Sequence, residues 1–257
     1  MSNQLINPFT TTIPKLENVT EKYRFISTAE FIQDVKDLGY TLENTRSPRK
    51  GLGMHSMVFS HPTMPKVDGL DLRLLATNSH DGTSAFRLHL QVGVNVCANI
   101  LVSFVPGLAA HSRVVHRGYA ASKVRIAIDA VREHVDTVLS GVSTLQARDV
   151  TPENAAEFLK RAAELRDAKP YNILDLQYAR HAAQRENTAW NVFNRVQESI
   201  VKGGYRTEAI AEYDIPRHGI VKGMPIPGNK ARELTSVKER VQTNYKLWEL
   251  AVATLLK

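Results

Sequence analysis

The sequence predicts an α+β fold, with an antiparallel sheet of about four strands flanked by helices, followed by a mainly helical C-terminal half. Two observations lead to this prediction. Between residues 40 and 100, apolar and polar residues alternate in short runs separated by turn residues, which is typical of half-buried strands. Beyond residue 119, apolar residues recur at every third or fourth position, which is the period of a helix.

The first regular element is expected to be a short amphipathic helix that begins after Ser27. Ser27 and Glu30 have the spacing of a capping box, and Gly39 has the position of a C-terminal cap. Residues 1–22 are polar and contain prolines, so we expect them to form an extended arm. The apolar residues of the helix follow helical spacing: Phe31, Ile32, Val35 and Leu38.

Strand-like segments follow at residues 40–45, 54–60, 70–77 and 84–96. The dipeptide Asp81-Gly82 separates the last two and is typical of hairpin turns, because glycine accepts a positive φ. We interpret His80 as part of this turn, so its replacement by alanine should leave stability and binding largely intact. Polar residues of the hairpin fall opposite the leucines, on a face that we expect to be open to solvent: Asp71, Arg73, Arg87, His89 and Gln91.

The remainder of the chain is predicted to be mainly helical. Thr151 is expected to cap one helix, Asn187 or Thr188 another, and Gly203 to end the latter. Residues 205–229 contain three prolines and are expected to be irregular. One predicted helix begins at about residue 119, and another starts at Thr151 and continues to about residue 166. A third lies between its cap at 187 or 188 and Gly203, and the closing helix carries apolar residues at positions from 237 to 255.

The order of the elements predicts three parts. Residues 1–22 form the extended arm, residues 23–146 form an α+β sheet domain, and residues 147–257 form a helical region packed on the sheet domain. A chain of 257 residues is long enough to bury a core of this kind.

The composition combines an ordinary hydrophobic content with an excess of positive charge. The chain has 33 Lys and Arg against 26 Asp and Glu, a formal net charge of +7. Such an excess favours a polyanionic partner, because basic residues that neutralise phosphates release counterions. A single cysteine excludes an internal disulfide framework, and no window is long and apolar enough for a membrane span. We therefore expect a cytoplasmic protein that does not bind membranes.

One short segment, residues 76–101, gathers residue types that occur in active sites and metal sites. It contains His80, Asp81, His89 and Cys97, but it lacks the close ligand pair of a typical metal site. No P-loop or G-x-S-x-G motif occurs, and the carboxylates are expected on solvated helix faces. We therefore expect no enzyme, no catalytic residue, no cofactor and no metal. An enzyme that uses Cys97 or the His80–Asp81 pair is the least favoured alternative.

Basic residues suited to phosphate binding occur in the loop near residue 46, on the polar hairpin face and before the helix at residue 119. Arginine and lysine in a groove can follow a nucleic-acid backbone, and an aromatic residue can stack on a base. Tyr119 and Tyr205 are the tyrosines considered for stacking. The predicted nucleic-acid contacts are Arg46, Arg49, Lys50, Arg73, Arg87, Arg113, Arg117, Tyr119, Lys123 and Arg125.

Three stretches resemble one family. NSHDGTSAFRLHLQVGVNVCANIL, at residues 78–101, resembles the signature of the phage and plasmid-like proteins grouped as domain of unknown function 932. NTAWNVFNRVQE, at 187–198, looks like a later helical motif of that family, and KYRFISTAEFIQDVKDLGY, at 22–40, is similar to its phage-type N-terminal segment. The resemblance implies a mobile-element setting. The order of helix, strands and helix is also similar to the core of Rad52-like single-strand annealing proteins.

These observations favour a single-stranded DNA-binding protein of a bacteriophage that acts in replication, recombination or transcription through a basic groove. The alternative is a phage protein-interaction module that recruits or inhibits a host enzyme, with host RNA polymerase as a candidate partner. The C-terminal helix and the proline-rich loop would then carry the function. The apolar residues of that helix have heptad-like spacing, so we expect them to dock on the core or to contact a neighbouring subunit of a homo-oligomer, and docking on the core is favoured.

Overall fold

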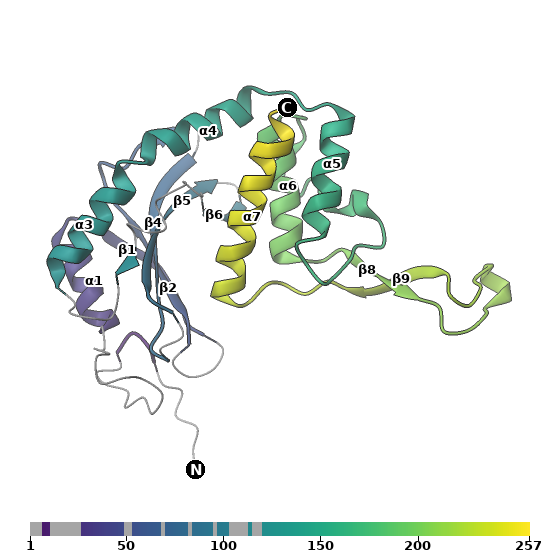
Figure 1. Cartoon of the computed structure of the whole chain (residues 1–257), viewed down its shortest axis with the longest axis horizontal. Helices are drawn as coiled ribbons and strands as arrows, with labels where there is room; N and C mark the ends of the chain where they lie inside the picture. Colours follow the sequence, from purple (N-terminus) through teal and green to yellow (C-terminus); the bar gives the residue numbers. More distant parts are fainter. Residues whose placement is uncertain are drawn as a thin grey trace, which may run out of the picture. The chain divides into compact units, whose positions relative to one another are not determined.

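The structure is a computed structural model (Figure 1), and it describes residues 7–10, 27–48, 53–67, 70–81, 84–94, 97–102, 113–114 and 120–257. Its contacts divide the chain into two compact units. The first unit comprises residues 1–140 and 236–241, and the second comprises 141–235 and 242–257. The predicted boundaries of the arm, the sheet domain and the helical region stay predictions. The packing of the helical region on the sheet domain also stays a prediction.

The first unit is built on an antiparallel sheet, as predicted. Its main strands lie in the order β1-β2-β4-β5-β6, while β3 pairs with β4 and β7 pairs with β5. All of these pairs are antiparallel. The sheet extends beyond the four predicted strands, because β6 and β7 follow residue 96. The strands are β1 (Thr41–Arg46), β2 (His55–Ser60), β3 (Lys66–Val67), β4 (Leu70–Asn78), β5 (Phe86–Val94), β6 (Cys97–Val102) and β7 (Arg113–Val114).

Two helices cover one face of this sheet, α1 (Thr28–Asp37) and α3 (Ala121–Arg132) (Figure 1). The Ser27 side chain caps α1 by accepting a hydrogen bond from the Glu30 backbone N–H, as the sequence predicts. Phe31 of α1 contacts Phe59 and Phe86 of the sheet, with ring centroids 6.0 and 4.1 Å apart. The even-numbered residues of β4 and β5 therefore face the helices and form the core.

The helix predicted from residue 119 is divided into α3 and α4 (Val135–Ala147). The break lies at His134, whose ring Nδ1 donates to the carbonyl of Ala130 at 2.9 Å. The backbone N–H of His134 bonds to Val131 instead, at 3.2 Å. A side chain that takes the carbonyl four residues earlier competes with the helical ladder, which explains the interruption.

The second unit is mainly helical. Thr151 caps α5 (Pro152–Ala163) and Thr188 caps α6 (Ala189–Lys202), so Thr188 rather than Asn187 is the cap. The C-terminal helix is α7 (Val237–Leu255), and it contains the apolar positions from which a closing helix was predicted. Aromatic residues form the contact between α6 and α7. The ring of Phe193 on α6 packs edge-on against the ring of Trp248 on α7, with the ring centroids 5.9 Å apart. Short 3-10 helices, η1 (Ile173–Gln177) and η2 (Ala182–Gln184), lie between α5 and α6.

The region 205–229 is a hairpin and not the irregular loop that its prolines predict. Strands β8 (Arg206–Ile210) and β9 (Pro225–Lys230) pair antiparallel, and the 3-10 helix η3 (Pro216–His218) lies beyond them. The pair is two-stranded, so a proline in β9 can sit where no partner needs its missing N–H. The hairpin projects away from α5, α6 and α7 (Figure 1).

None of the helices in the described ranges is long and apolar enough to cross a membrane.

Candidate functional site

Three arginines lie in one row across the sheet, near the end where β4 turns into β5. Directly paired residues of antiparallel strands point to the same face of a sheet. The row therefore lies on the face opposite α1 and α3. We call it the arginine row. The register places its five members opposite one another in succession: Arg46, Ser56, Thr77, Arg87 and Arg113.

Arg87 and Arg113 are direct cross-strand partners on β5 and β7. Arg87 is half-buried and Arg113 is exposed. Within the described part of the chain, neither guanidinium forms an ion pair with a carboxylate. Like charges directly opposite each other are destabilising, by roughly 0.2–1 kcal/mol. The pair is therefore a site where a bound anion would offset repulsion within the sheet.

Arg73 lies on the same face but outside the row. Its register partner is Gln91. The guanidinium is 3.5 Å from the carboxylate of Asp71, and both side chains are partly exposed. Asp71 offsets part of the charge of Arg73, which makes it a weaker phosphate ligand than Arg87 or Arg113.

The other predicted contacts are not brought together with the row. Lys123 and Arg125 are exposed on α3, which covers the opposite face of the sheet. Arg49, Lys50, Arg117 and Tyr119 lie outside the described residues.

The other tyrosine considered for stacking, Tyr205, is a core residue. It is buried, its hydroxyl donates to the carbonyl of Ala168 at 3.0 Å, and burial raises its pKa. The prediction that this ring can stack on a base is therefore wrong for this conformation.

The polar hairpin face is not open to solvent at its centre, contrary to the prediction. His89 and Gln91 are each only 3% exposed, and their neighbours Val58 and Leu75 are also buried. Burial lowers the pKa of His89 to about 3, so the ring is neutral near pH 7. Alternation in the sequence separates the two faces of a strand, but it does not show whether the polar face is also covered.

The NSHD segment forms a buried network and not an exposed turn. Asn78, Ser79 and His80 are completely buried. The network is centred on the hydroxyl of Thr28 at the start of α1, which lies 2.8 Å from Nε2 of His55 and 2.9 Å from Nε2 of His80. Nδ2 of Asn78 donates to the same hydroxyl at 3.1 Å.

Two backbone carbonyls orient the histidine rings. His55 Nδ1 bonds to the carbonyl of Gly53 at 3.1 Å, so its Nε2 is the atom that accepts from Thr28. His80 Nε2 bonds to the carbonyl of Pro8 at 2.9 Å and thereby holds residues 7–10 against the sheet. Burial lowers the pKa of His55 to about 4 and also lowers that of His80, which keeps both rings neutral near pH 7.

A hydroxyl beside an imidazole is the arrangement of an activated nucleophile. Here the Thr28 side chain is fully buried, so a substrate could not reach it in this conformation. The network instead joins four parts of the first unit: residues 7–10, α1, the start of β2 and the β4–β5 connection. Its role in this structure is to hold these segments together.

We expect His80→Ala to lower the free energy of unfolding by about 1–3 kcal/mol, because Thr28 and the carbonyl of Pro8 lose a buried partner. Urea unfolding followed by circular dichroism measures this change. His218→Ala is the matched control, since His218 is exposed on the β8–β9 hairpin and should change stability by less than about 0.5 kcal/mol. Equal stability of the two variants would contradict a structural role for His80.

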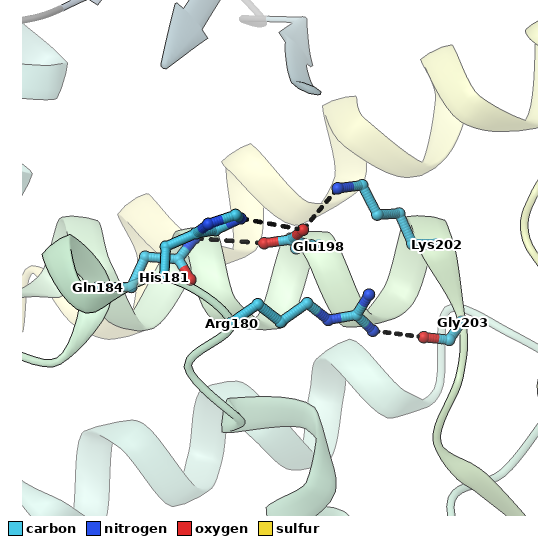
Figure 2. Close-up of polar contacts among 6 residues, drawn as sticks. All are labelled: Arg180, His181, Gln184, Glu198, Lys202 and Gly203. Carbon is cyan, nitrogen blue, oxygen red and sulfur yellow. Dashed lines mark hydrogen bonds and ion pairs between the residues drawn. The ribbon is translucent and has the colours of Figure 1, made fainter. Parts of the chain in front are cut away.

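The second unit contains a buried ionic network on α6 (Figure 2). The carboxylate of Glu198 is 2% exposed and accepts from Lys202 Nζ at 2.6 Å and from Gln184 Nε2 at 3.4 Å, while His181 Nε2 lies 3.6 Å away. Burial pushes the pKa of Glu198 up, but the hydrogen bond and charge of Lys202 outweigh it and hold the pKa below its usual value. The expectation that carboxylates lie on solvated helix faces is wrong for Glu198.

Other polar residues of the NTAWNVFNRVQE stretch also make structural contacts. The buried guanidinium of Arg195 donates to the carbonyls of Gln184 and Glu186, the latter at 3.0 Å. Gln197 Nε2 donates to Oδ1 of Asn244 on α7 at 2.6 Å. Arg180 adds a bond to the carbonyl of Gly203 at 2.7 Å (Figure 2). These contacts hold the segment that precedes α6 against that helix, and they join α7 to it as well.

Comparison with known proteins places these networks in a family context. A family model described as Domain of unknown function (DUF932) matches residues 15–248. The chain belongs to this family. The resemblance seen in the sequence is thereby confirmed, and in this DUF932 member all three stretches that carry it contribute to buried polar networks. These contributions come from Thr28, residues 78–80 and residues 187–198.

Two Escherichia coli (strain K12) proteins are similar to this DUF932 chain. UPF0380 protein YafZ is 24% identical over 254 residues, which cover 94% of this chain and 85% of YafZ. UPF0380 protein YfjQ is 25% identical over 202 residues, which cover 74% of this chain and 72% of YfjQ. No solved structure matches the chain.

Proposed function

We propose that the protein binds single-stranded nucleic acid and that the arginine row is its phosphate contact. The observation that carries this proposal is the direct pairing of Arg87 with Arg113 on one face of the sheet. A phosphate between the two guanidinium groups would replace their repulsion by charge-assisted hydrogen bonds. Arginine suits this role because its planar donors match phosphate oxygens.

Ser56 and Thr77 in the middle of the row are buried, so an extended ligand would contact the row at its two ends. Arg46 on β1 is separated from Arg87 on β5 by β2 and β4, which corresponds to about 14 Å at the usual strand spacing. A single strand that follows the row would meet Arg46 at one end and the Arg87–Arg113 pair at the other. The net charge of +7 would favour the approach of any polyanion.

The proposed setting is a bacteriophage protein in the cytoplasm of the host cell, acting on single-stranded DNA in replication, recombination or transcription. On this proposal the protein works by binding alone, without catalysis, cofactor or metal. The test is fluorescence anisotropy of a labelled oligothymidine over a series of salt concentrations. If the logarithm of the association constant falls linearly with the logarithm of the salt concentration, phosphate contacts are supported. Failure to bind at low salt excludes them.

Lys123 and Arg125 should contribute less than the row, because α3 covers the other face of the sheet. We expect K123E/R125E to weaken oligothymidine binding by less than about threefold, an effect of net charge rather than of lost contacts. The salt slope should stay within about 0.3 of the wild-type value. If K123E/R125E lowers the salt slope as much as a double substitution in the arginine row does, the nucleic acid continues around β7 onto α3.

A second candidate function is a protein-interaction module that recruits or inhibits a host enzyme such as RNA polymerase. The observation in its favour is the β8–β9 hairpin, which exposes large apolar side chains. If the wild-type protein does not bind oligothymidine, this function takes the place of nucleic-acid binding.

A further inference from the structure

The β8–β9 hairpin exposes four large apolar side chains to solvent. Large apolar groups scattered singly are ordinary on protein surfaces, but several on one projecting element indicate a contact surface. The four side chains and their exposed fractions are Ile210 at 54%, Tyr213 at 67%, Val221 at 63% and Met224 at 45%.

The backbone edges of the hairpin do not favour the addition of another strand. On the β8 side, the N–H of Glu208 bonds to the carbonyl of Lys169 at 2.8 Å, and the carbonyl of Arg206 accepts from Tyr171 at 2.9 Å. On the β9 side, Pro225 and Pro227 have no N–H to donate. A partner must therefore meet the side chains of the hairpin.

A cleft lies in the same unit, between α5, residues 169–173 and one side of the β8–β9 hairpin. Its apolar lining includes Ala163, Pro170, Ile173 and Met224. Lys160, Arg166 and Lys169 supply three positive charges to its rim, against the two negative charges of Glu164 and Glu208.

Lys160 is the rim cation best placed to meet a ligand. Lys169 is bound to Glu208 at 2.7 Å, and Arg166 donates to the carbonyls of Ile200 and Arg232, each at 2.7 Å. Lys160 is exposed and has no ion pair among the residues that the structure describes. Its charge is thus available at the edge of an apolar cleft.

The segment Glu212-Tyr213-Asp214 of the hairpin is complementary to this cleft. An exposed aromatic ring matches the apolar lining, and the exposed carboxylates on either side of it match the positive rim. Asp214 is fixed by accepting from the backbone N–H of Lys222 at 2.6 Å, which leaves Glu212 as the carboxylate that can adapt. Tyr213 does not line the cleft of its own chain and is 67% exposed, so a second chain is the natural source of this segment.

We propose that two copies of the chain exchange their hairpins. Tyr213 of each copy enters the cleft of the other, and Glu212 pairs with Lys160. Because each hairpin lies in the cleft of the other copy, the two contacts are equivalent and the assembly closes as a twofold dimer. The attraction is local, which matters because two chains of charge +7 otherwise repel each other. This dimer is independent of nucleic-acid binding.

Sedimentation equilibrium of the full chain, at low salt and without oligonucleotide, tests the dimer. The wild-type protein should approach twice the monomer mass as its concentration rises. E212K and K160E should each weaken dimerisation by about tenfold, and Tyr213→Ser by about thirtyfold. These residues are exposed, so circular dichroism and the unfolding midpoint should match those of wild type.

Charge exchange makes the test specific. The double variant E212K/K160E should regain dimerisation, and a mixture of E212K with K160E should form mixed dimers in which both hairpin contacts are complementary. Lys246→Glu, an equal charge change at an exposed position of α7, should dimerise like wild type. The proposal is overturned if the wild-type protein remains monomeric at every concentration. It is equally overturned if the variants dimerise as wild type does, or if charge exchange restores nothing.

Discussion

The double variant R87E/R113E should bind oligothymidine about a hundredfold more weakly than the wild-type protein at low salt, at about tenfold per arginine. The slope of log K against log salt should fall by roughly 1.4, because each phosphate contact on a single strand contributes about 0.7. The loss should be uniform across base sequences, since phosphate contacts carry no sequence information. Anisotropy titrations over a salt series measure both quantities.

A single substitution separates binding from folding. Arg113→Glu places a carboxylate opposite Arg87, which should raise the free energy of unfolding by about 0.2–1 kcal/mol while it weakens binding. The control K238E/K246E has the same net charge as R87E/R113E, but its changes lie on exposed positions of α7. If this control loses as much affinity as R87E/R113E, or if Arg113→Glu binds like wild type, the arginine row is not the site.

Local signals in the sequence predicted much of the fold. Ser27, Thr151 and Thr188 each place a side-chain oxygen before a helix, and each caps the expected helix in the structure. Alternating residues on either side of Asp81 predicted the β4–β5 pair. These signals act between residues a few positions apart, so the sequence displays them directly.

The arginine row could not be predicted as a unit, although its arginines were each named as candidates. It depends on the pairing of β5 with β7, a strand of only two residues that is too short for alternation to appear. The register between strands that are distant in sequence determines which side chains share a row. The prolines at 225 and 227 led to the wrong prediction of an irregular loop, because strand pairing again could not be seen in the sequence. A two-stranded hairpin tolerates proline at positions where a central strand would not.

The buried polar networks were missed because polar residues were assigned to solvent. His80 and Glu198 have side chains that usually lie on the surface, and only their tertiary partners show that they are buried. One signal was available in the sequence. Asn194, Arg195, Gln197 and Glu198 fall within a single helix that also carries Trp190 and Phe193, and so many polar groups beside large apolar ones indicate a helix that is buried around most of its circumference.

The network around Glu198 leads to the largest stability change that we expect. Lys202→Met leaves a carboxylate that is 2% exposed without its cation, and removal of one partner of a buried ion pair costs about 3–5 kcal/mol. His181 and Gln184 remain near the carboxylate and place the expected loss at the lower end of this range. Urea unfolding at about pH 7 measures the loss. Lys246→Met, at an exposed position of α7, is the matched control and should change stability by less than about 0.5 kcal/mol.

The pH dependence of this variant distinguishes a buried charge from a loss of packing. In the wild-type protein Lys202 holds the pKa of Glu198 below its ordinary value, so the pair stabilises the fold above that ordinary value and the contribution is lost as pH falls. Without Lys202, burial raises the pKa of Glu198 above its value in the unfolded chain, and the penalty is relieved as pH falls and the carboxylate takes up a proton. The stability deficit of Lys202→Met should therefore shrink between about pH 7 and about pH 5.

The double variant E198Q/K202M should be more stable than Lys202→Met at neutral pH, because it leaves no buried charge without a partner. A deficit that is constant with pH, and that E198Q does not relieve, would mean that Lys202 contributes packing and not charge.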